Sequence, residues 1–205
     1  MAKSRSESGR GSFVELVTII VVAVGLALLI QAFLVKPYRI PSASMEPTLA
    51  IGQRVLVNRL GNRFGDPSVG DVIVFHPPAG AERNAGEQCG AQPPGGQVCM
   101  RETPAEAKDT TFIKRVVAAP GDRIKVVGGV VFRNGKRVDE PYTRRCLGSG
   151  CDFPAEVRVP AGHWFMMGDN RGDSDDSRFW GPVPRGWIIG DAFATYWPPK
   201  RIGLL

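Results

Sequence analysis

The chain has 205 residues, of which 43% are hydrophobic and 22% charged, and this length suits a single ordinary domain. Its apolar content is too high for a disordered chain, and its 25 glycines follow no collagen period. The 26 lysines and arginines against 20 acidic residues give a net charge of +6, but the basic residues are scattered and form no aromatic-interleaved patch. We therefore expect a packed globule that does not bind nucleic acid.

One long apolar run lies near the N-terminus. Residues 13–35 read FVELVTIIVVAVGLALLIQAFLV and are interrupted only by Glu15 and Gln31. Roughly 20 such residues span the hydrocarbon core of a bilayer, whereas the apolar part of a cleaved signal has about 7–15 residues and ends at small ones. Here the run ends at Lys36, a natural interfacial anchor. The sequence predicts an uncleaved transmembrane helix over 13–35 rather than a buried soluble helix or a removed signal.

Charge and cysteine positions indicate the orientation of this helix. The count of basic residues on its two sides favours a cytoplasmic segment 1–12. Two close cysteine pairs beyond the helix suit two disulfides in an oxidising compartment, although four cysteines allow three pairings. Neither pair has the tighter spacing or the neighbouring histidines of a zinc site, so we expect no metal. Residues 36–205 are expected to lie outside the cytoplasm, and their cysteines are Cys89, Cys99, Cys146 and Cys151.

Beyond the helix the sequence is typical of β structure. Short runs rich in valine, isoleucine and phenylalanine alternate with turn residues, without a long amphipathic helix. Asn134-Gly135 stands between two such runs and is the strongest short signal for a β-hairpin. Residues 77–109 are rich in glycine, proline and alanine and indicate a long surface loop. The predicted fold is mainly β, with strand candidates at 54–60, 71–76, 111–119, 122–127, 129–138 and 163–168.

Two segments carry candidate catalytic side chains. PSASMEPTL, residues 41–49, forms a rigid, irregular turn that offers Ser44 as a nucleophile, although such segments are also common linkers. Lys114 lies among apolar neighbours in TFIKRVVAAPGD, where loss of water lowers the pKa of an amine and favours a general base. The alternative is an edge-strand lysine whose amine reaches water.

The two histidines give little support to a Ser-His-Asp triad. His76 precedes two prolines at a strand end, and His163 lies at a turn-to-strand junction, and both positions are typical of surface or packing residues. A Ser-Lys pair activates a serine without histidine. The residues therefore favour Ser44 with Lys114 but leave the pairing open.

A third segment, MGDNRGDSDDSRFWGPV at 167–183, mixes charges, hydroxyls and turn formers. Its Asp-x-Asp spacing suggests a calcium loop, yet no EF-hand pattern is completed. Alternating arginines and aspartates suit an internal ion-pair network better than metal chelation. The charged residues are Asp169, Arg171, Asp173, Asp175, Asp176 and Arg178.

Together these segments resemble the bacterial type I signal peptidases, membrane-bound serine proteases that remove signal peptides from exported proteins. The matches, in the order of the family, are PSASMEPTL, GDVIVF at 70–75, KRVVAAPGD at 114–122 and GDNRGDSDDSR at 168–178. They continue through WGPV and YWPPKRIG and omit the loop 77–109 and the region around the second cysteine pair. The resemblance implies an antiparallel β ectodomain with a short inserted β subdomain at about 123–159.

The resemblance also implies roles for individual residues. Ser44 matches the nucleophile of the Ser-Lys dyad, and Lys114 matches its general base. Ser42 matches the serine whose hydroxyl, with the backbone N–H of Ser44, forms the oxyanion hole. Ser174 matches the hydroxyl that orients the lysine. The enzyme implied is a serine endopeptidase that needs no cofactor.

A supporting ion pair, matched by Asp176 and Arg178, completes the implied site. The implied partners are preprotein signal peptides and the lipid bilayer, and the implied location is the bacterial plasma membrane, crossed once with the N-terminus in the cytoplasm. The family holds small side chains before the scissile bond in shallow pockets. The matching pocket positions are Tyr38, Ile40, Leu49, Phe112 and Ile113.

Two other functions fit the same sequence. One is a specialised homologue that cuts a different exported target. The other is a non-catalytic, membrane-anchored β module that binds exported chains. The sequence carries no signal for the oligomeric state or for the particular preproteins.

Overall fold

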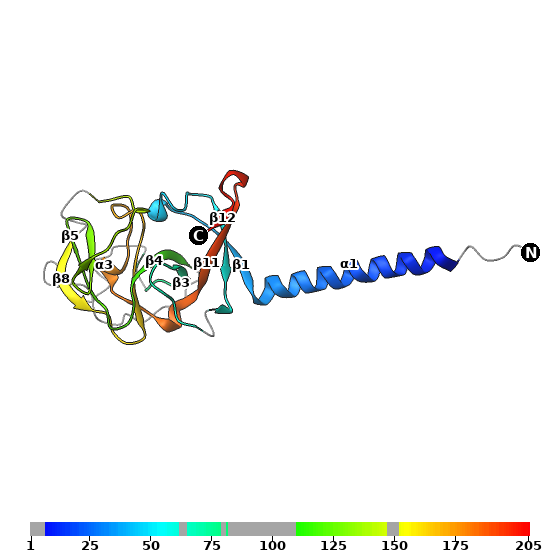
Figure 1. The fold of residues 1–205 in the computed structure, drawn as a ribbon, viewed down its shortest axis with the longest axis horizontal. Helices are drawn as coiled ribbons and strands as arrows, with labels where there is room; N and C mark the ends of the chain where they lie inside the picture. The colour runs from blue at the N-terminus through cyan, green and yellow to red at the C-terminus, as the bar shows by residue number, and fades with distance from the viewer. Residues whose placement is uncertain (1–6, 62–64, 79–80, 82–109, 147–151) are drawn as a thin grey trace, which may run out of the picture.

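The computed structural model describes residues 7–61, 65–78, 81, 110–146 and 152–205 (Figure 1). Helix α1 (Glu7–Phe33) projects from a domain built of strands, which confirms the mainly β fold with an N-terminal apolar helix. The helix ends at Phe33, before the predicted limit of 35, because Val35 already pairs with Asn58 as the first residue of a strand.

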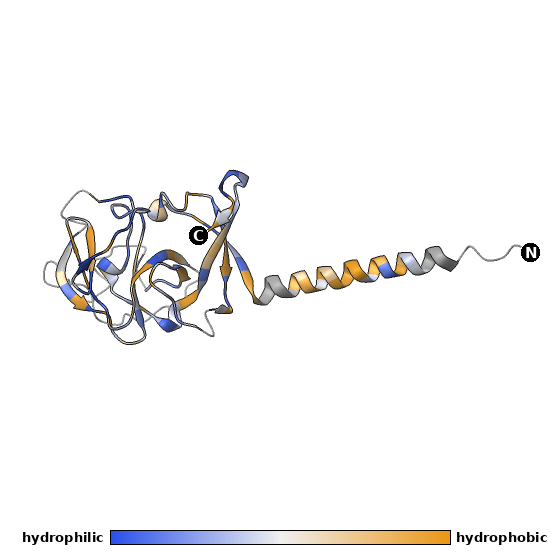
Figure 2. Ribbon diagram, viewed as in Figure 1, coloured by the Kyte–Doolittle hydropathy of each residue, from blue (hydrophilic) through white to orange (hydrophobic). Residues whose placement is uncertain are grey.

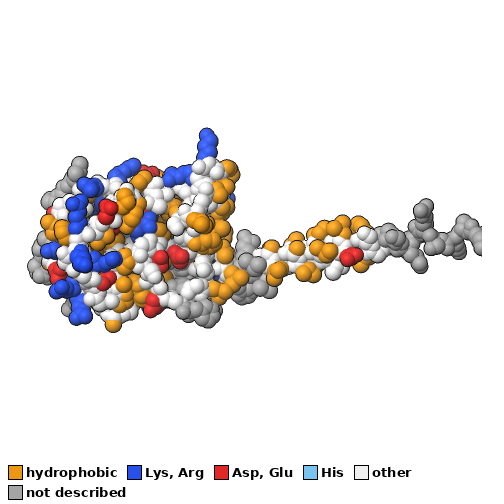
Figure 3. Space-filling view, viewed as in Figure 1, with side chains coloured by type: hydrophobic (Ala, Val, Ile, Leu, Met, Phe, Trp, Pro, Cys, Tyr) orange, Lys and Arg blue, Asp and Glu red, His pale blue; other side chains and the backbone are white. Residues whose placement is uncertain are grey.

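The surface of α1 is apolar along most of its length. The window Gly11–Leu28 has a mean hydropathy of 2.3, and none of it is buried against the rest of the chain (Figures 2 and 3). At 1.5 Å per residue these 18 residues extend about 27 Å, close to the thickness of a bilayer core. By length and composition, α1 is therefore long and apolar enough to cross a membrane.

Eight antiparallel strands form the large sheet. Their spatial order is β1-β2-β11-β3-β4-β9-β10, and β12 pairs with the far end of β11. The bounds are Val35–Arg39 (β1), Arg54–Asn58 (β2), Val72–Phe75 (β3), Phe112–Ala118 (β4), His163–Met167 (β9), Val183–Pro184 (β10), Ile188–Trp197 (β11) and Gly203–Leu204 (β12).

Strand β11 is central to this sheet, although its sequence does not alternate cleanly. Register shifts interrupt its pairing with both β2 and β3. At Gly190 the two backbones come so close that a Cβ would collide with the carbonyl oxygen of Asn58. Glycine is therefore required at this position, and it also weakens the strand pattern that the sequence shows.

Four further strands form a small sheet with the order β7-β6-β5-β8. Asn134 and Gly135 both have positive φ, 54° and 77°, and join β6 to β7, which confirms the predicted hairpin. This sheet lies within the stretch 123–159 for which an inserted subdomain is expected. The bounds are Arg123–Val127 (β5), Val130–Arg133 (β6), Lys136–Arg137 (β7) and Phe153–Arg158 (β8).

Among the described residues the hydrophobic core consists of three clusters, and one of them joins the two sheets. Val117 of β4 and Phe165 of β9 pack there against Ile124, Val126 and Val131 of the small sheet. Full burial of each such side chain contributes about 1.5–3 kcal/mol. The small sheet is thus attached to the large one by apolar packing. Short helices complete the fold at Ala43–Met45 (η1), Ser177–Trp180 (α3), Arg185–Trp187 (η3) and Pro199–Arg201 (η4).

The predicted cysteine pairs lie almost wholly outside the described residues. Cys89, Cys99 and Cys151 belong to the undescribed stretches, as does most of the predicted loop 77–109. Cys146 is described and is not a free thiol. Both disulfide pairings therefore stay predictions.

Candidate active site

Ser44 lies in the turn that follows β1. It belongs to the short helix η1 and is 7% exposed, while the neighbouring Met45 and Leu49 are fully buried and anchor the turn in the core. Asn170 fixes the turn from the other side: its backbone N–H donates to the Ser44 carbonyl over 3.0 Å, and its side chain donates to the Ala43 carbonyl over 3.2 Å. The Ser44 hydroxyl is therefore held in one place by packing and by hydrogen bonds.

Lys114 pairs with Ile73 of β3, and the pairing of β4 with β9 begins at the next residue, Arg115. The Lys114 side chain is 4% exposed, so the alternative of a lysine whose amine reaches water is wrong. The Lys114 Nζ donates a hydrogen bond of 2.7 Å to the Ser44 Oγ, across 70 positions of sequence. The structure thus brings the two predicted catalytic side chains into direct contact.

Burial lowers the pKa of Lys114 from 10.5 to about 8. The nearby carboxylates of Asp176 and Asp175 oppose this effect because they favour the ammonium form. A substantial fraction of the amine is thus neutral near pH 7 to 8, as a general base requires. A neutral amine 2.7 Å from a serine hydroxyl can accept its proton.

The segment 168–178 forms the wall beside the amine. A Cβ at Gly168 would collide with the Ser174 side chain and the Ser44 carbonyl, so only glycine allows this approach. Asp176 is fully buried and accepts hydrogen bonds from the backbone N–H of Gly168 and from Arg178, whose guanidinium is 2.8 Å away. Burial alone raises the pKa of Asp176, but the charge and hydrogen bonds of Arg178 outweigh it and hold that pKa below its usual value.

Ser174 is placed differently from its implied role. Its hydroxyl donates to the Asp176 carboxylate over 2.8 Å, and the hydrogen bond that the Lys114 amine donates goes to Ser44. A direct Ser174–Lys114 hydrogen bond is therefore not part of this arrangement within the described residues. Ser174 lines the same cleft as Lys114 and connects that cleft to the Asp176–Arg178 pair.

The predicted oxyanion donors lie side by side. The Ser42 Oγ is 3.3 Å from the Ser44 Oγ, and Ser42 is exposed at the start of η1 without capping that helix. The backbone N–H of Ser44 has no hydrogen-bond partner among the described residues. Two donors next to the nucleophile are thus available for a third group.

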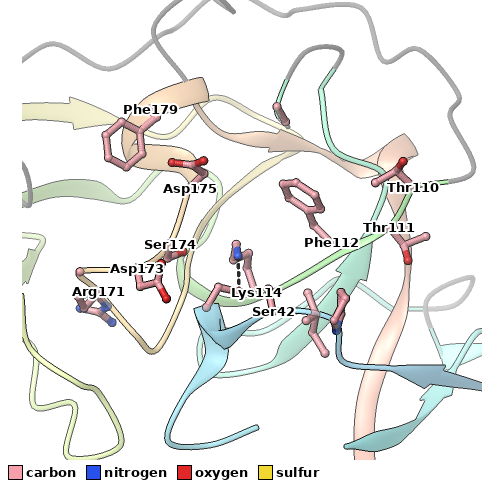
Figure 4. A pocket seen from close by; sticks show the side chains of 15 residues that line it. Ser42, Thr110, Thr111, Phe112, Lys114, Arg171, Asp173, Ser174, Asp175 and Phe179 are labelled. Atoms are coloured by element: carbon pink, nitrogen blue, oxygen red, sulfur yellow. Dashed lines mark hydrogen bonds between the residues drawn. The ribbon is translucent and has the colours of Figure 1, made fainter. Parts of the chain in front are cut away.

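These residues open into a cleft of about 680 Å³ (Figure 4). Phe112 and Ile113 line it, as predicted for the pocket. Ile40 and Leu49 do not line the cleft. They are 2% and 0% exposed and belong to the hydrophobic cluster around Val55 and Val72, against which Tyr38 packs. The turn that holds Ser44 buries them, so their expected contact with a substrate is not supported by this arrangement.

Two ion pairs extend beyond the network that the sequence indicates. Arg115 forms a bidentate pair with the buried Asp169, with N–O distances of 2.9 and 2.7 Å. Arg171 forms a second bidentate pair with Glu140, both distances being 2.7 Å. Sequence reasoning missed Arg115, and it missed Glu140 as the partner of Arg171. The only local signal that Arg115 belongs to the site was its position directly after Lys114.

Alternative chemistries find little support at the cleft. The ring of His76 contacts the Thr110 carbonyl at 3.4 Å and that of His163 the Ala161 carbonyl at 2.8 Å, and neither histidine lines the cleft. Within the described ranges, no cluster of three or more histidine, cysteine or acidic side chains is arranged to hold a metal. Ser44 and Lys114 therefore stay the candidate nucleophile and base.

The chain is similar to several known proteins. The family model described as signal peptidase, peptidase S26, matches residues 13–197. A probable signal peptidase I-1 of Synechocystis sp. is 38% identical over 191 residues, which cover 93% of this chain and 86% of the relative. A signal peptidase I of Bacillus licheniformis is 31% identical over 210 residues, covering 98% of each chain. The crystal structure of a signal peptidase I from Enterococcus faecalis V583 aligns with a TM-score of 0.40 at 20% identity, over 62% of this chain and 97% of that one.

The family model and the two relatives show that the chain belongs to the signal peptidase family, peptidase S26. The resemblance stated from the sequence motifs is thereby confirmed. The family consists of peptidases, and the chain is accordingly a serine endopeptidase, a hydrolase of peptide bonds.

Proposed function

We propose that this chain is a membrane-anchored endopeptidase that removes signal peptides from exported preproteins, with Ser44 as nucleophile and Lys114 as general base. The observation that carries the proposal is the 2.7 Å contact between the Lys114 Nζ and the Ser44 Oγ, with both side chains buried. The relatives named above are signal peptidases, which supports the choice of substrate.

Acylation begins with proton transfer. The neutral Lys114 amine accepts the proton of the Ser44 hydroxyl while the Ser44 Oγ attacks the scissile carbonyl carbon. The oxygen of the tetrahedral intermediate accepts hydrogen bonds from the Ser44 N–H and the Ser42 hydroxyl. As the C–N bond breaks, the Lys114 ammonium gives its proton to the departing amine, and an ester with Ser44 remains.

Deacylation repeats these steps with water. Lys114, again neutral, accepts a proton from a water molecule that attacks the ester carbonyl. The proton then passes to the Ser44 Oγ as the signal peptide leaves with a new carboxyl group. The negative charge of Asp176, which Ser174 and Arg178 hold in place, stabilises the ammonium form that Lys114 adopts during each step.

An unpaired strand edge offers a place for the substrate. Strand β9 pairs with β4 only from Arg115 onward, so along residues 112–114 that side of β4 has no partner among the described residues. An extended peptide adds to such an edge through main-chain hydrogen bonds. Phe112 and Ile113 then limit the side chains before the scissile bond to small ones.

The helix α1 anchors the enzyme in the bacterial plasma membrane. The proposed organisation is a cytoplasmic segment 1–12, a span over 13–35 and an extracytoplasmic catalytic domain 36–205, with 123–159 as an inserted β subdomain. The apolar surface of α1 and the short distance along the chain to Ser44 support this proposal. The proposed disulfides pair Cys89 with Cys99 and Cys146 with Cys151.

The non-catalytic binding module accounts poorly for the site. Burying an amine disfavours folding, and a binding surface has no need to place that amine against a serine hydroxyl. A specialised homologue shares the dyad and differs only in its target. Cleavage of a preprotein with an ordinary signal peptide therefore distinguishes the two functions.

The test is cleavage of a preprotein by the full chain in detergent. The wild type is expected to release the signal peptide, while Ser44→Ala and Lys114→Ala leave the preprotein uncut. A matched control is Lys125→Ala, a lysine of the small sheet that does not line the cleft. An intact preprotein with the wild type, or equal cleavage by Lys114→Ala, contradicts the proposal.

A further inference from the structure

The catalytic cleft has two chemically different ends. Figure 4 shows the Lys114 amine between them, with Ser42, Thr110 and Thr111 towards one end. Towards the other end lie the side chains of the 171–175 segment and of Phe179. The first end carries hydroxyl groups and the open edge of β4, and the second carries carboxylates.

The carboxylates of Asp173 and Asp175 are exposed in the cleft wall. Within the described residues neither forms an ion pair or a side-chain hydrogen bond. Asp169 differs, because it is buried and neutralised by Arg115. The charge of Arg171 at the same end is already taken by Glu140. Two carboxylates without a direct ion pair among the described residues therefore face the solvent of the cleft.

These charges act on the interior of the cleft. Asp175 and Asp173 are both among the groups that raise the pKa of the Lys114 amine against the effect of its burial. A charge that influences the catalytic amine also influences a peptide that passes over it, since both occupy the same cleft.

Chain direction assigns this end to the part of the substrate after the scissile bond. In the proposed mode of binding, the small residues before that bond lie along the free edge of β4, next to Thr111 and Phe112. A peptide that continues past the Ser44 Oγ then runs towards Ser174 and the two aspartates. The first residues of the mature protein therefore meet the acidic end.

Phe179 adds a second feature to the same end. Its ring is partly buried and lines the cleft with Asp175. The Arg178 guanidinium already lies 5.5 Å from the centre of this ring, so the ring offers a substrate an apolar wall. The apolar stem of a lysine or arginine side chain suits such a wall while its charge meets the neighbouring carboxylate. Neutral small side chains gain nothing from either group.

We infer that Asp173 and Asp175, with Phe179, form a subsite that favours basic residues immediately after the cleavage site and disfavours acidic ones. This inference rests on the proposed function, because it assumes that a signal peptide occupies the strand edge. It concerns residues outside the dyad, so Asp173 and Asp175 select substrates without taking part in the chemistry.

The test uses three peptides with the same small residues before the scissile bond. The two positions after it are Lys-Lys, Glu-Glu or Ser-Ser. With the full wild-type chain in detergent at low salt, kcat/KM is expected to be about tenfold higher for Lys-Lys than for Glu-Glu, as two exposed charge contacts imply. At about 1 M salt, where the screening length is about 3 Å, the ratio should approach one.

The variants are Asp173→Asn with Asp175→Asn, and Asp139→Asn as the matched control. Asp139 is equally exposed but does not line the cleft. The double variant should cut Lys-Lys and Glu-Glu within twofold of each other, while Asp139→Asn keeps the wild-type ratio. The Ser-Ser peptide reports any change in the chemistry itself, which affects all three peptides equally.

Equal wild-type cleavage of Lys-Lys and Glu-Glu overturns the inference and leaves the proposed function intact. A preference that persists in the double variant also overturns it. If the wild type cuts none of the three peptides, the proposed function fails, and the inference fails with it.

Discussion

The two halves of β4 share one strand but have different neighbours. Residues 112–114 have β3 on one side and an edge without a described partner on the other. Residues 115–118 pair with β9, and on the other side Arg115 pairs with β3 while Val116 exchanges backbone hydrogen bonds with Gly70 and Asp71 just before β3. Val117 and Ala118 pack on the small sheet. The second half is thus fixed by backbone hydrogen bonds and the core, and it holds Lys114 in place at the boundary. A buried, chemically active amine can be kept rigid by its own strand.

The largest expected effect is that of Lys114→Met on activity. Removal of the base should lower kcat/KM by at least about 10⁴-fold, as for other catalytic dyads and triads. Stability at pH 7 should not fall, because burial of the charged amine disfavours the folded wild type there.

The pH dependence of unfolding checks the same variant. Between about pH 8 and 10.5 the unfolded wild type holds the Lys114 proton and the folded form does not, so wild-type stability rises with pH. Urea titrations of Lys114→Met should lack this rise. If Lys114→Met is several kcal/mol less stable than the wild type at pH 7, the Lys114 side chain itself stabilises the fold, and the contrast between the two halves of β4 is wrong.

Arg115→Ala tests the boundary between the halves. It leaves the buried Asp169 carboxylate without its bidentate partner, so the free energy of unfolding should fall by about 3–5 kcal/mol. Chemical denaturation measures the loss. The double variant Arg115→Met with Asp169→Leu should recover part of it, because no unpaired charge then remains; no recovery would mean that Arg115 acts through other contacts.

Ser42→Ala should slow the chemical step in the open half. Loss of one oxyanion donor lowers kcat by about 10²- to 10³-fold, with little change in KM. Single-turnover kinetics on a peptide substrate measure it. Ser68→Ala, an exposed serine outside the cleft, serves as the control and should match the wild type. An unchanged kcat in Ser42→Ala would remove Ser42 from the oxyanion hole.

Val117→Ala should affect the closed half alone. Val117 is buried in the cluster that joins the sheets, and loss of its two methyl groups should cost about 2 kcal/mol of unfolding free energy. The activity of the folded enzyme should stay at the wild-type level. A more than tenfold loss of kcat at a temperature where the variant is folded would show that the halves are not separable.

A last check needs no substitution and is the pH profile of the wild type. Since neutral Lys114 is the active form and burial lowers its pKa to about 8, kcat/KM should rise about tenfold per unit below that pH and level off above it. Initial rates with a neutral peptide between pH 6 and 10 measure this. A flat profile between pH 6 and 8 would exclude Lys114 as the titrating base.

Local signals in the sequence predicted the strands and the hairpin well. Asn134-Gly135 fixes its turn because few residues accept positive φ, and β4 follows a compact apolar run. Strand β11 escaped notice, because Gly190, which the close approach of β2 requires, interrupts the pattern. The end of α1 was placed too late because Val35 suits both a helix and a strand.

The parts of the candidate site that lie within sequence motifs were predictable. The contacts between residues far apart in the sequence were less so. The segments around Ser44 and Lys114 indicated each residue as a candidate, but their pairing came from the resemblance, since nothing local to either residue specifies a contact across 70 positions. The Arg115–Asp169 and Arg171–Glu140 pairs have no fixed spacing and arise only when β4, β9 and the small sheet assemble. Burial of Ile40 and Leu49 depends on a different assembly, in which residues of β2, β3, β4 and β11 pack around them.

One residue, Leu34, separates the end of α1 from the start of β1. The carbonyl of Leu34 accepts a hydrogen bond from the backbone N–H of Arg59, the residue that follows β2. The junction is therefore bound to the sheet and is too short to act as a hinge. Helix and sheet are therefore expected to move as one rigid unit. The tilt angle of the helix then sets the direction in which the cleft opens. Lengthening this junction with a few glycines should uncouple the two.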